Sequence, residues 1–119
     1  MTKTADELKP NYAPLYAAAM YPKLALAVQS KGYALAIHGS MARDFDVIAI
    51  PWTPDAASPE EVIQAIEAVL AVNIIGPPSA RPHGRTAYML SVGFGNCSID
   101  LSFMPRTEEG MAEATKEAR

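Results

Sequence analysis

The sequence is poor in cysteine, in long apolar runs and in excess charge of either sign. Its 119 residues include one cysteine, Cys97, so no internal disulfide can form and no cysteine cluster suggests structural zinc. No apolar run approaches the ~20 residues that a membrane-spanning helix needs. The first residues, Met1 to Lys9, lack the apolar core of a signal peptide. We therefore expect an intracellular, cytoplasmic protein that makes no membrane contact.

The charge balance excludes a broad basic surface. Ten Lys and Arg residues against 13 Asp and Glu residues give a net charge of −3. An extended nucleic-acid surface would need a basic excess, although a local basic pocket remains compatible with this total. Half of the residues are hydrophobic, which suits one packed core. We expect a single domain over residues 1–119, with flexible ends at 1–10 and 107–119.

The first half of the chain predicts one helical region and two strands. Alanine-rich Asn11–Ser30 has helical spacing, and Pro22 should kink it or split it into two helices. Tyr33–His38 reads as a short buried strand. In Asp44–Ile50 apolar residues occur on both faces, which is typical of a central strand.

The second half predicts a capped helix and a hairpin. Ser58 and Glu61 form a capping-box pattern before an amphipathic helix. The segment Asn73–Gly84 is rich in glycine and proline and predicts an irregular loop. Strands are expected at Arg85–Val92 and Cys97–Phe103. This order predicts an α+β fold, with a small mixed sheet of about four strands and helices packed on one face.

Three aspartates stand out as candidate metal ligands. Asp44 and Asp46 are two positions apart on one strand, so their side chains share a face and repel each other. Asp100 lies on a later strand with Ser98 and Ser102 on its own face. A divalent cation such as Mg²⁺ or Mn²⁺ would remove the repulsion, because hard cations prefer carboxylate oxygens.

A Gly39-Ser40 turn precedes the aspartate pair, and together they resemble a known family. Gly39 allows backbone to approach a phosphate, and Ser40 offers a hydroxyl. A strand ending in Gly-Ser, an Asp-x-Asp strand and a third acid on a later strand mark the nucleotidyltransferase superfamily, which includes DNA polymerase beta and the minimal nucleotidyltransferases. The resemblance covers Tyr33 to Met104.

This resemblance implies metal-dependent transfer of a nucleotidyl group from a nucleoside triphosphate to an acceptor that the sequence does not identify. Asp44, Asp46 and Asp100 would hold the metal, and Asp100 would also be the natural group to activate the acceptor hydroxyl. The Gly-Ser pair would contact the triphosphate. Arg43 would either help to hold it or pair with a nearby acid.

A non-catalytic alternative stays open. Only Met41, Ala42 and Arg43 separate the Gly-Ser pair from the acids, whereas the family usually has a short helix and a longer segment there. The fold would then serve as a module that binds a nucleotide or a protein partner. The sequence is also similar to short phage-encoded proteins with His-Gly-Ser and Ala-Ile-Pro-Trp signatures, which suggests a phage origin. A small domain of this kind is compatible with a homo-oligomer.

Several other residues have two possible interpretations each. His38, at a strand end, is either a hydrogen-bonded structural residue or an acid–base group. Arg81, His83 and Arg85 are either a phosphate clamp or part of a solvated loop. Trp52 is expected to anchor packing at the edge of the core, with base stacking as the alternative.

Overall fold

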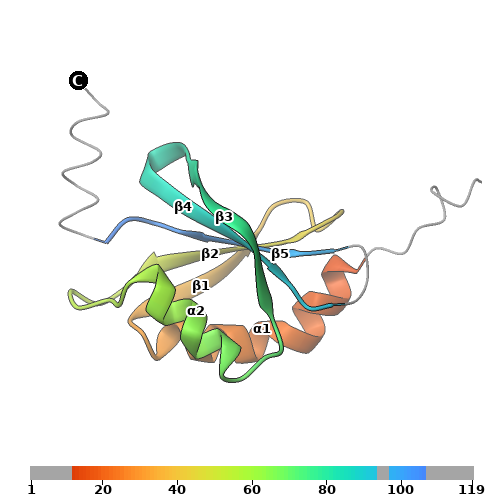
Figure 1. The fold of residues 1–119 in the computed structure, drawn as a ribbon, viewed down its shortest axis with the longest axis horizontal. Helices are drawn as coiled ribbons and strands as arrows, with labels where there is room; N and C mark the ends of the chain where they lie inside the picture. Colours follow the sequence, from red (N-terminus) through yellow and green to blue (C-terminus); the bar gives the residue numbers. More distant parts are fainter. Residues whose placement is uncertain (1–11, 94–96, 107–119) are drawn as a thin grey trace, which may run out of the picture.

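The computed structural model describes residues 12–93 and 97–106, which form one five-stranded sheet and two helices (Figure 1). This arrangement confirms the α+β class, with one strand more than the sequence predicted. The elements in chain order are α1 (Ala13–Gln29), β1 (Tyr33–His38), β2 (Phe45–Pro51), α2 (Pro59–Glu67), β3 (Asn73–Arg81), a 3₁₀ turn (Pro82–Gly84), β4 (Arg85–Ser91) and β5 (Ile99–Phe103).

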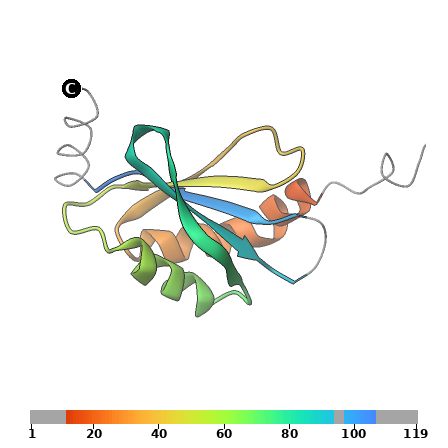
Figure 2. The ribbon, with the colours of Figure 1, turned by 45° about the horizontal axis from the view of Figure 1, so that its top comes forward.

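The sheet is mixed, and both helices lie on one side of it. The strand order is β1-β2-β5-β4-β3, so β5, the last strand along the chain, lies in the middle of the sheet. β2 and β5 run parallel, and the other three neighbouring pairs run antiparallel. Figures 1 and 2 show α1 and α2 side by side against the same face. The opposite face carries no helix of the described chain.

The core lies between the helices and the inward side of the central strands. Alternation along β2 buries Phe45, Val47 and Ala49 on the side that faces the helices. The helices bury Tyr16, Leu24 and Val28 of α1 and Val62, Ile63 and Ile66 of α2. From β5 come Ile99, Leu101 and Phe103.

The start of α2 is confirmed in detail. The Ser58 hydroxyl accepts a hydrogen bond from the Glu61 amide at 3.3 Å and donates to the Glu61 carboxylate at 3.1 Å. Pro59 occupies the first helical position, where its missing N–H costs nothing. The helix ends at Glu67, and Val69, just beyond it, is exposed.

The split into two helices, one of the two outcomes expected at Pro22, is absent, because α1 continues through it as one helix. Pro22 is exposed, so its ring faces solvent and displaces no core residue. Buried residues on both sides of it, Tyr16 before and Leu24 after, hold the two halves on the same sheet. Tertiary packing therefore outweighs the lost backbone hydrogen bond.

The expected irregular loop at Asn73–Gly84 is wrong. Its first nine residues form β3, the fifth strand, at one edge of the sheet. Ile75 pairs with Met89 and Ser79 with Ala87, so residues 76–78 of β3 lie opposite the single residue Tyr88. This bulge contains Gly76, Pro77 and Pro78, and it removes the prolines from the hydrogen-bonded ladder.

Within the described residues, neither helix combines the length and apolar character needed to cross a membrane. The ends that the sequence predicted to be flexible, residues 1–10 and 107–119, lie outside the described chain.

Candidate functional site

The face of the sheet that no described helix covers is called the open face. One row of paired residues crosses it. Asp46 on β2 lies directly opposite Asp100 on the neighbouring parallel strand β5. Adjacent strands are about 4.8 Å apart, so the two carboxylates start from neighbouring backbone positions on one face. The complete row, from β1 to β3, is His38, Asp46, Asp100, Met89 and Ile75.

The Asp46 carboxylate lies in an unfavourable electrostatic environment. Its side chain is partly buried, and the described residues offer its carboxylate neither a hydrogen bond nor an ion pair. Burial raises its pKa above the usual value for aspartate, and the charge of Asp100 raises it further. His38 and Arg81 act in the opposite direction but do not cancel these effects. A cation at this carboxylate would relieve both costs.

Asp100 is held by an arginine from the edge of the sheet. The Arg81 guanidinium donates to the Asp100 carboxylate at 3.2 Å, and its Nε donates to the Ser79 hydroxyl at 3.3 Å. Because β4 lies between β3 and β5, the Arg81 side chain must cross β4 to make this pair. Arg85, the register partner of Arg81, reaches the buried Ser102 hydroxyl at 3.5 Å.

The expected cluster of Arg81, His83 and Arg85 is therefore divided. The two arginines lean over the open face toward β5. His83 is exposed in the 3₁₀ turn, where its φ of 67° is left-handed. Sequence reasoning missed the ion pair with Asp100. The available signal was the hairpin spacing of Arg81 and Arg85 around Gly84, which places both residues at one level of a two-stranded ribbon.

Asp44 has a different contact. Its Oδ1 accepts a hydrogen bond from the Ser98 amide at 3.2 Å, beside the backbone bond from Phe45 to Ser98 at 2.9 Å. Asp44 thus ties the start of β2 to the residues before β5. In the described part of the chain, no three Asp, Glu, His or Cys side chains form a group that could hold a metal ion. The three predicted aspartates, Asp44, Asp46 and Asp100, therefore lie near one end of β2 and β5 but do not form a common metal site.

The Gly39 turn is fitted closely to Asp46. Gly39 has a φ of 80°, and a Cβ at this position would collide with the Asp46 carboxylate. The Ser40 hydroxyl accepts a hydrogen bond from the Ala42 amide at 3.2 Å, which stabilises the turn. Arg43 is exposed and pairs with no acid of the described residues, contrary to one of its two readings.

Trp52 and Cys97 have environments that separate them from this row. Trp52 is 79% exposed, so the expectation that it anchors packing at the edge of the core is wrong. Cys97 is buried, and burial is the main cause that raises the pKa of its thiol. The Tyr16 hydroxyl donates to the Cys97 carbonyl at 3.1 Å. A thiol held in its neutral form has little nucleophilic character.

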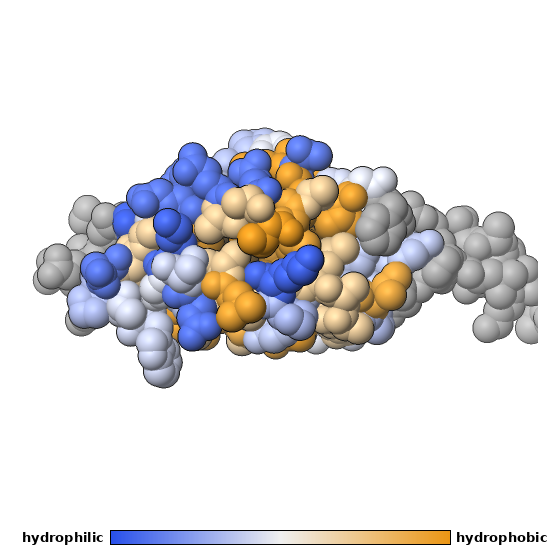
Figure 3. Space-filling view, turned by 90° about the horizontal axis from the view of Figure 1, so that it is seen from below, coloured by the Kyte–Doolittle hydropathy of each residue, from blue (hydrophilic) through white to orange (hydrophobic). Residues whose placement is uncertain are grey.

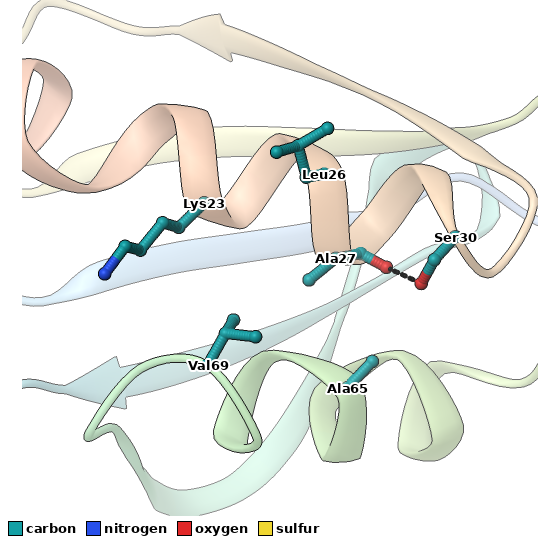
Figure 4. A pocket seen from close by; sticks show the side chains of 6 residues that line it. All are labelled: Lys23, Leu26, Ala27, Ser30, Ala65 and Val69. Carbon is teal, nitrogen blue, oxygen red and sulfur yellow. Dashed lines mark hydrogen bonds between the residues drawn. The ribbon is translucent and has the colours of Figure 1, made fainter.

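A pocket of about 490 Å³ lies on the other side of the sheet, between α1 and α2 (Figure 4). Its walls are mainly apolar, with Leu26 on α1 and Val69 after α2, and Lys23 is the only ionisable group among them. Figure 3 shows hydrophobic residues gathered across the middle of this helix side. The pocket lacks the acids that the open face provides, so we place the candidate site on the open face.

No protein-family model matches the chain, and searches of curated proteins and of solved structures find no significant match.

Proposed function

We propose that the open face binds a nucleoside triphosphate together with Mg²⁺ or Mn²⁺, and that the protein transfers the nucleotidyl group to an acceptor hydroxyl. The observation that carries this proposal is the register of Asp46 and Asp100, which sets two carboxylates side by side on adjacent parallel strands. The proposal agrees with the resemblance of the Gly-Ser and Asp-x-Asp segments to nucleotidyltransferases. The acceptor is not identified by any feature of the site.

The donor set fits a hard divalent cation in its chemistry. Asp46 and Asp100 supply carboxylate oxygens. Burial, and after it the charge of Asp100, raises the pKa of Asp46, and a cation would favour the ionised form again. Asp44 Oδ1 accepts the hydrogen bond from the Ser98 amide, so the other carboxylate oxygen, Oδ2, is the one that would join Asp46 and Asp100. When bound, the cation would neutralise charge on the phosphates of the substrate.

The two arginines would bind the phosphates, and one aspartate would accept the proton. Arg81 and Arg85 would bind phosphate oxygens, because both guanidinium groups already lie on the open face. In the reaction an acceptor oxygen bonds to the α-phosphorus, the α–β phosphoanhydride bond breaks, and pyrophosphate leaves. The acceptor proton would pass to Asp46, because the raised pKa of this carboxylate makes it bind a proton more readily than an ordinary aspartate does.

A second candidate is a non-catalytic module that binds the nucleotide without transferring it. The observation in its favour is the engagement of two of the three acids, Asp44 by the Ser98 amide and Asp100 by Arg81. In this version Arg81 stays on Asp100, and the face recognises phosphate without a complete metal site.

Calorimetric titration of the full chain with Mn²⁺ and a non-hydrolysable nucleoside triphosphate tests the binding. We expect binding that needs both components and that weakens about tenfold or more in Asp46→Asn, equivalent to 1.4 kcal/mol. Asp55→Asn is the matched control, because Asp55 is an exposed loop residue beyond the other end of β2. If no binding occurs at about 1 mM nucleotide, both candidates are wrong.

Release of pyrophosphate separates the two candidates. Incubation with a hydrolysable triphosphate, Mn²⁺ and a panel of hydroxyl acceptors should release pyrophosphate and add a nucleotidyl mass to one acceptor. Binding with no release across ATP, GTP, CTP and UTP would favour the non-catalytic module.

A further inference from the structure

The pocket between α1 and α2 takes no part in the proposed reaction. It is called the helix pocket, and its lining residues are Lys23, Leu26, Ala27, Ser30, Ala65 and Val69. Its volume of about 490 Å³ lies within the range of about 300–1,000 Å³ that is typical of small-molecule sites. The acids and arginines of the proposed reaction lie across the sheet on the open face. A ligand of the helix pocket would therefore be a second ligand, and its binding does not depend on the proposed function.

Most of the wall of the helix pocket is apolar. Ala27 of α1 and Ala65 of α2 are small, so the two helices leave a slot between them instead of filling it with large side chains. Leu26 and Val69 stand beside this slot and are 67% and 50% exposed. An apolar ligand that covered these two side chains would remove their surface from water, which is favourable. The pocket therefore favours a ligand with an apolar body.

Lys23 makes one end of the helix pocket positively charged. Figure 4 shows Lys23 at one end of the pocket and Ser30 at the other. Within the described residues Lys23 forms no ion pair, so its ammonium group can bind an anion. The Ser30 hydroxyl donates its only proton to the Ala27 carbonyl at 2.6 Å, so it has none left for a ligand. Lys23 is thus the lining side chain that can donate to a ligand, and an anionic group would match it.

We propose that the helix pocket binds a single-chain amphiphile with an anionic head, of the class of medium-chain carboxylates. The alkyl chain lies over Ala27 and Ala65, and the carboxylate stays at the end of the pocket beside Lys23. Lys23 and the C-cap residue Ser30 are two helical turns apart, about 10 Å, which suits a chain of medium length. A second copy of this chain fits less well, because a two-fold contact centred on the pocket would bring two Lys23 ammonium groups together.

Titration of the full chain with monomeric decanoate, followed by NMR of the methyl groups, tests the proposal. We expect saturable shifts of the Ala27, Ala65 and Val69 methyl signals, with a Kd of about 1 mM or tighter. Trp52, the single tryptophan of the chain, lines a different groove beside β1, so its fluorescence should not change. Shifts that do not saturate by about 5 mM, or that gather around Trp52, would overturn the proposal.

Two pairs of variants test the slot and the charged end separately. Ala65→Leu fills the slot and should weaken decanoate binding about tenfold or more, whereas Ala68→Leu, at an exposed position at the end of α2, should not. Lys23→Gln should weaken decanoate binding about two- to fivefold, as expected for an exposed ion pair, and leave decanol binding unchanged. Lys31→Gln removes the same charge outside the pocket and should change neither.

Three further outcomes would contradict the proposal. Decanoate binding that Ala65→Leu leaves unchanged would place the ligand elsewhere. Equal weakening of decanoate and decanol in Lys23→Gln would show that the carboxylate does not lie beside Lys23. Binding to vesicles of an anionic phospholipid without binding of monomeric decanoate would assign the helix side to a membrane surface instead. The titration of the unmodified chain decides the matter even where a variant does not fold.

Discussion

The two faces of the sheet are built from the same strands but have opposite roles. On β2, Phe45, Val47 and Ala49 are fully buried under the helices, while Asp46 and Ile50 point to the open side. The covered face gains stability from apolar burial. The open face keeps two carboxylates close together and so carries an electrostatic cost. A cost retained beside a stable core is typical of functional surfaces, where binding and stability compete.

The largest expected difference between the faces comes from one substitution made on each. Ile99→Ala removes a fully buried side chain and should lower the free energy of unfolding by about 2–5 kcal/mol. Ile50→Ala, at a residue 39% exposed on the open face, should cost at most about 1 kcal/mol. Urea denaturation followed by circular dichroism measures both. Equal losses would show that the open face is packed as tightly as the core.

A smaller effect is expected at the Gly39 turn. Both Gly39→Ala and Gly76→Ala place alanine at a positive φ, which should cost about 1–2 kcal/mol in each case. Only Gly39→Ala also displaces the Asp46 carboxylate, because the space around Gly76 is open. NMR of the carboxyl carbons should therefore show a changed Asp46 pKa in the first variant alone. An unchanged Asp46 in Gly39→Ala would contradict the close fit of the turn.

The pH dependence of stability should also distinguish the open face from the face that the helices cover. The pKa of Asp46 is raised on folding, so the folded state binds the proton more tightly than the unfolded state. Its contribution to stability is therefore greatest at acid pH and falls as the pH rises from the unfolded pKa through the folded one. Asp46→Asn should flatten this part of the profile and raise the melting temperature at neutral pH. Glu67→Gln, at an exposed position on α2, is the control and should do neither.

The smallest effect on stability is expected from the ion pair of Arg81 and Asp100. Arg81 is partly exposed, so Arg81→Gln should change the free energy of unfolding by less than about 1 kcal/mol. The same substitution frees the Asp100 carboxylate and should strengthen binding of Mn²⁺ alone, measured by paramagnetic relaxation of water. Under the same conditions Arg85→Gln should have less effect, because Arg85 contacts Ser102. Unchanged Mn²⁺ affinity in Arg81→Gln would indicate that Asp100 takes no part in metal binding.

The sequence was sufficient where local signals and burial agreed. The α2 start was predictable because Ser58, Pro59 and Glu61 each favour the same helix boundary. Alternation likewise separated the apolar residues of β5 from the face that carries Asp100 and Ser102, and the apolar side is the buried one. It was insufficient where long-range pairing overruled local preference. The Gly76-Pro77-Pro78 segment reads as a loop, yet pairing with β4 on both sides of the bulge makes it part of a strand.

The candidate site was predictable only in part. The shared face of Asp46 and Asp100 follows from alternation, but their direct opposition depends on the register of two strands distant in sequence. The contact of Asp44 with the Ser98 amide needs the same register. The pairing of Arg81 with Asp100 depends on a strand that local reasoning did not predict. Residue type and periodicity thus identified the acids, and tertiary pairing determined their partners.

The parallel pairing of β2 with β5 also has a consequence for how the chain folds. Asp44 and Ser98, joined across this pair, are 54 positions apart, so a long segment must be closed before the central strand is in place. During synthesis, α1, β1, β2 and α2 all leave the ribosome before β5 does. During synthesis the acidic row therefore cannot be complete until β5 has been made, and closing this long segment should slow folding.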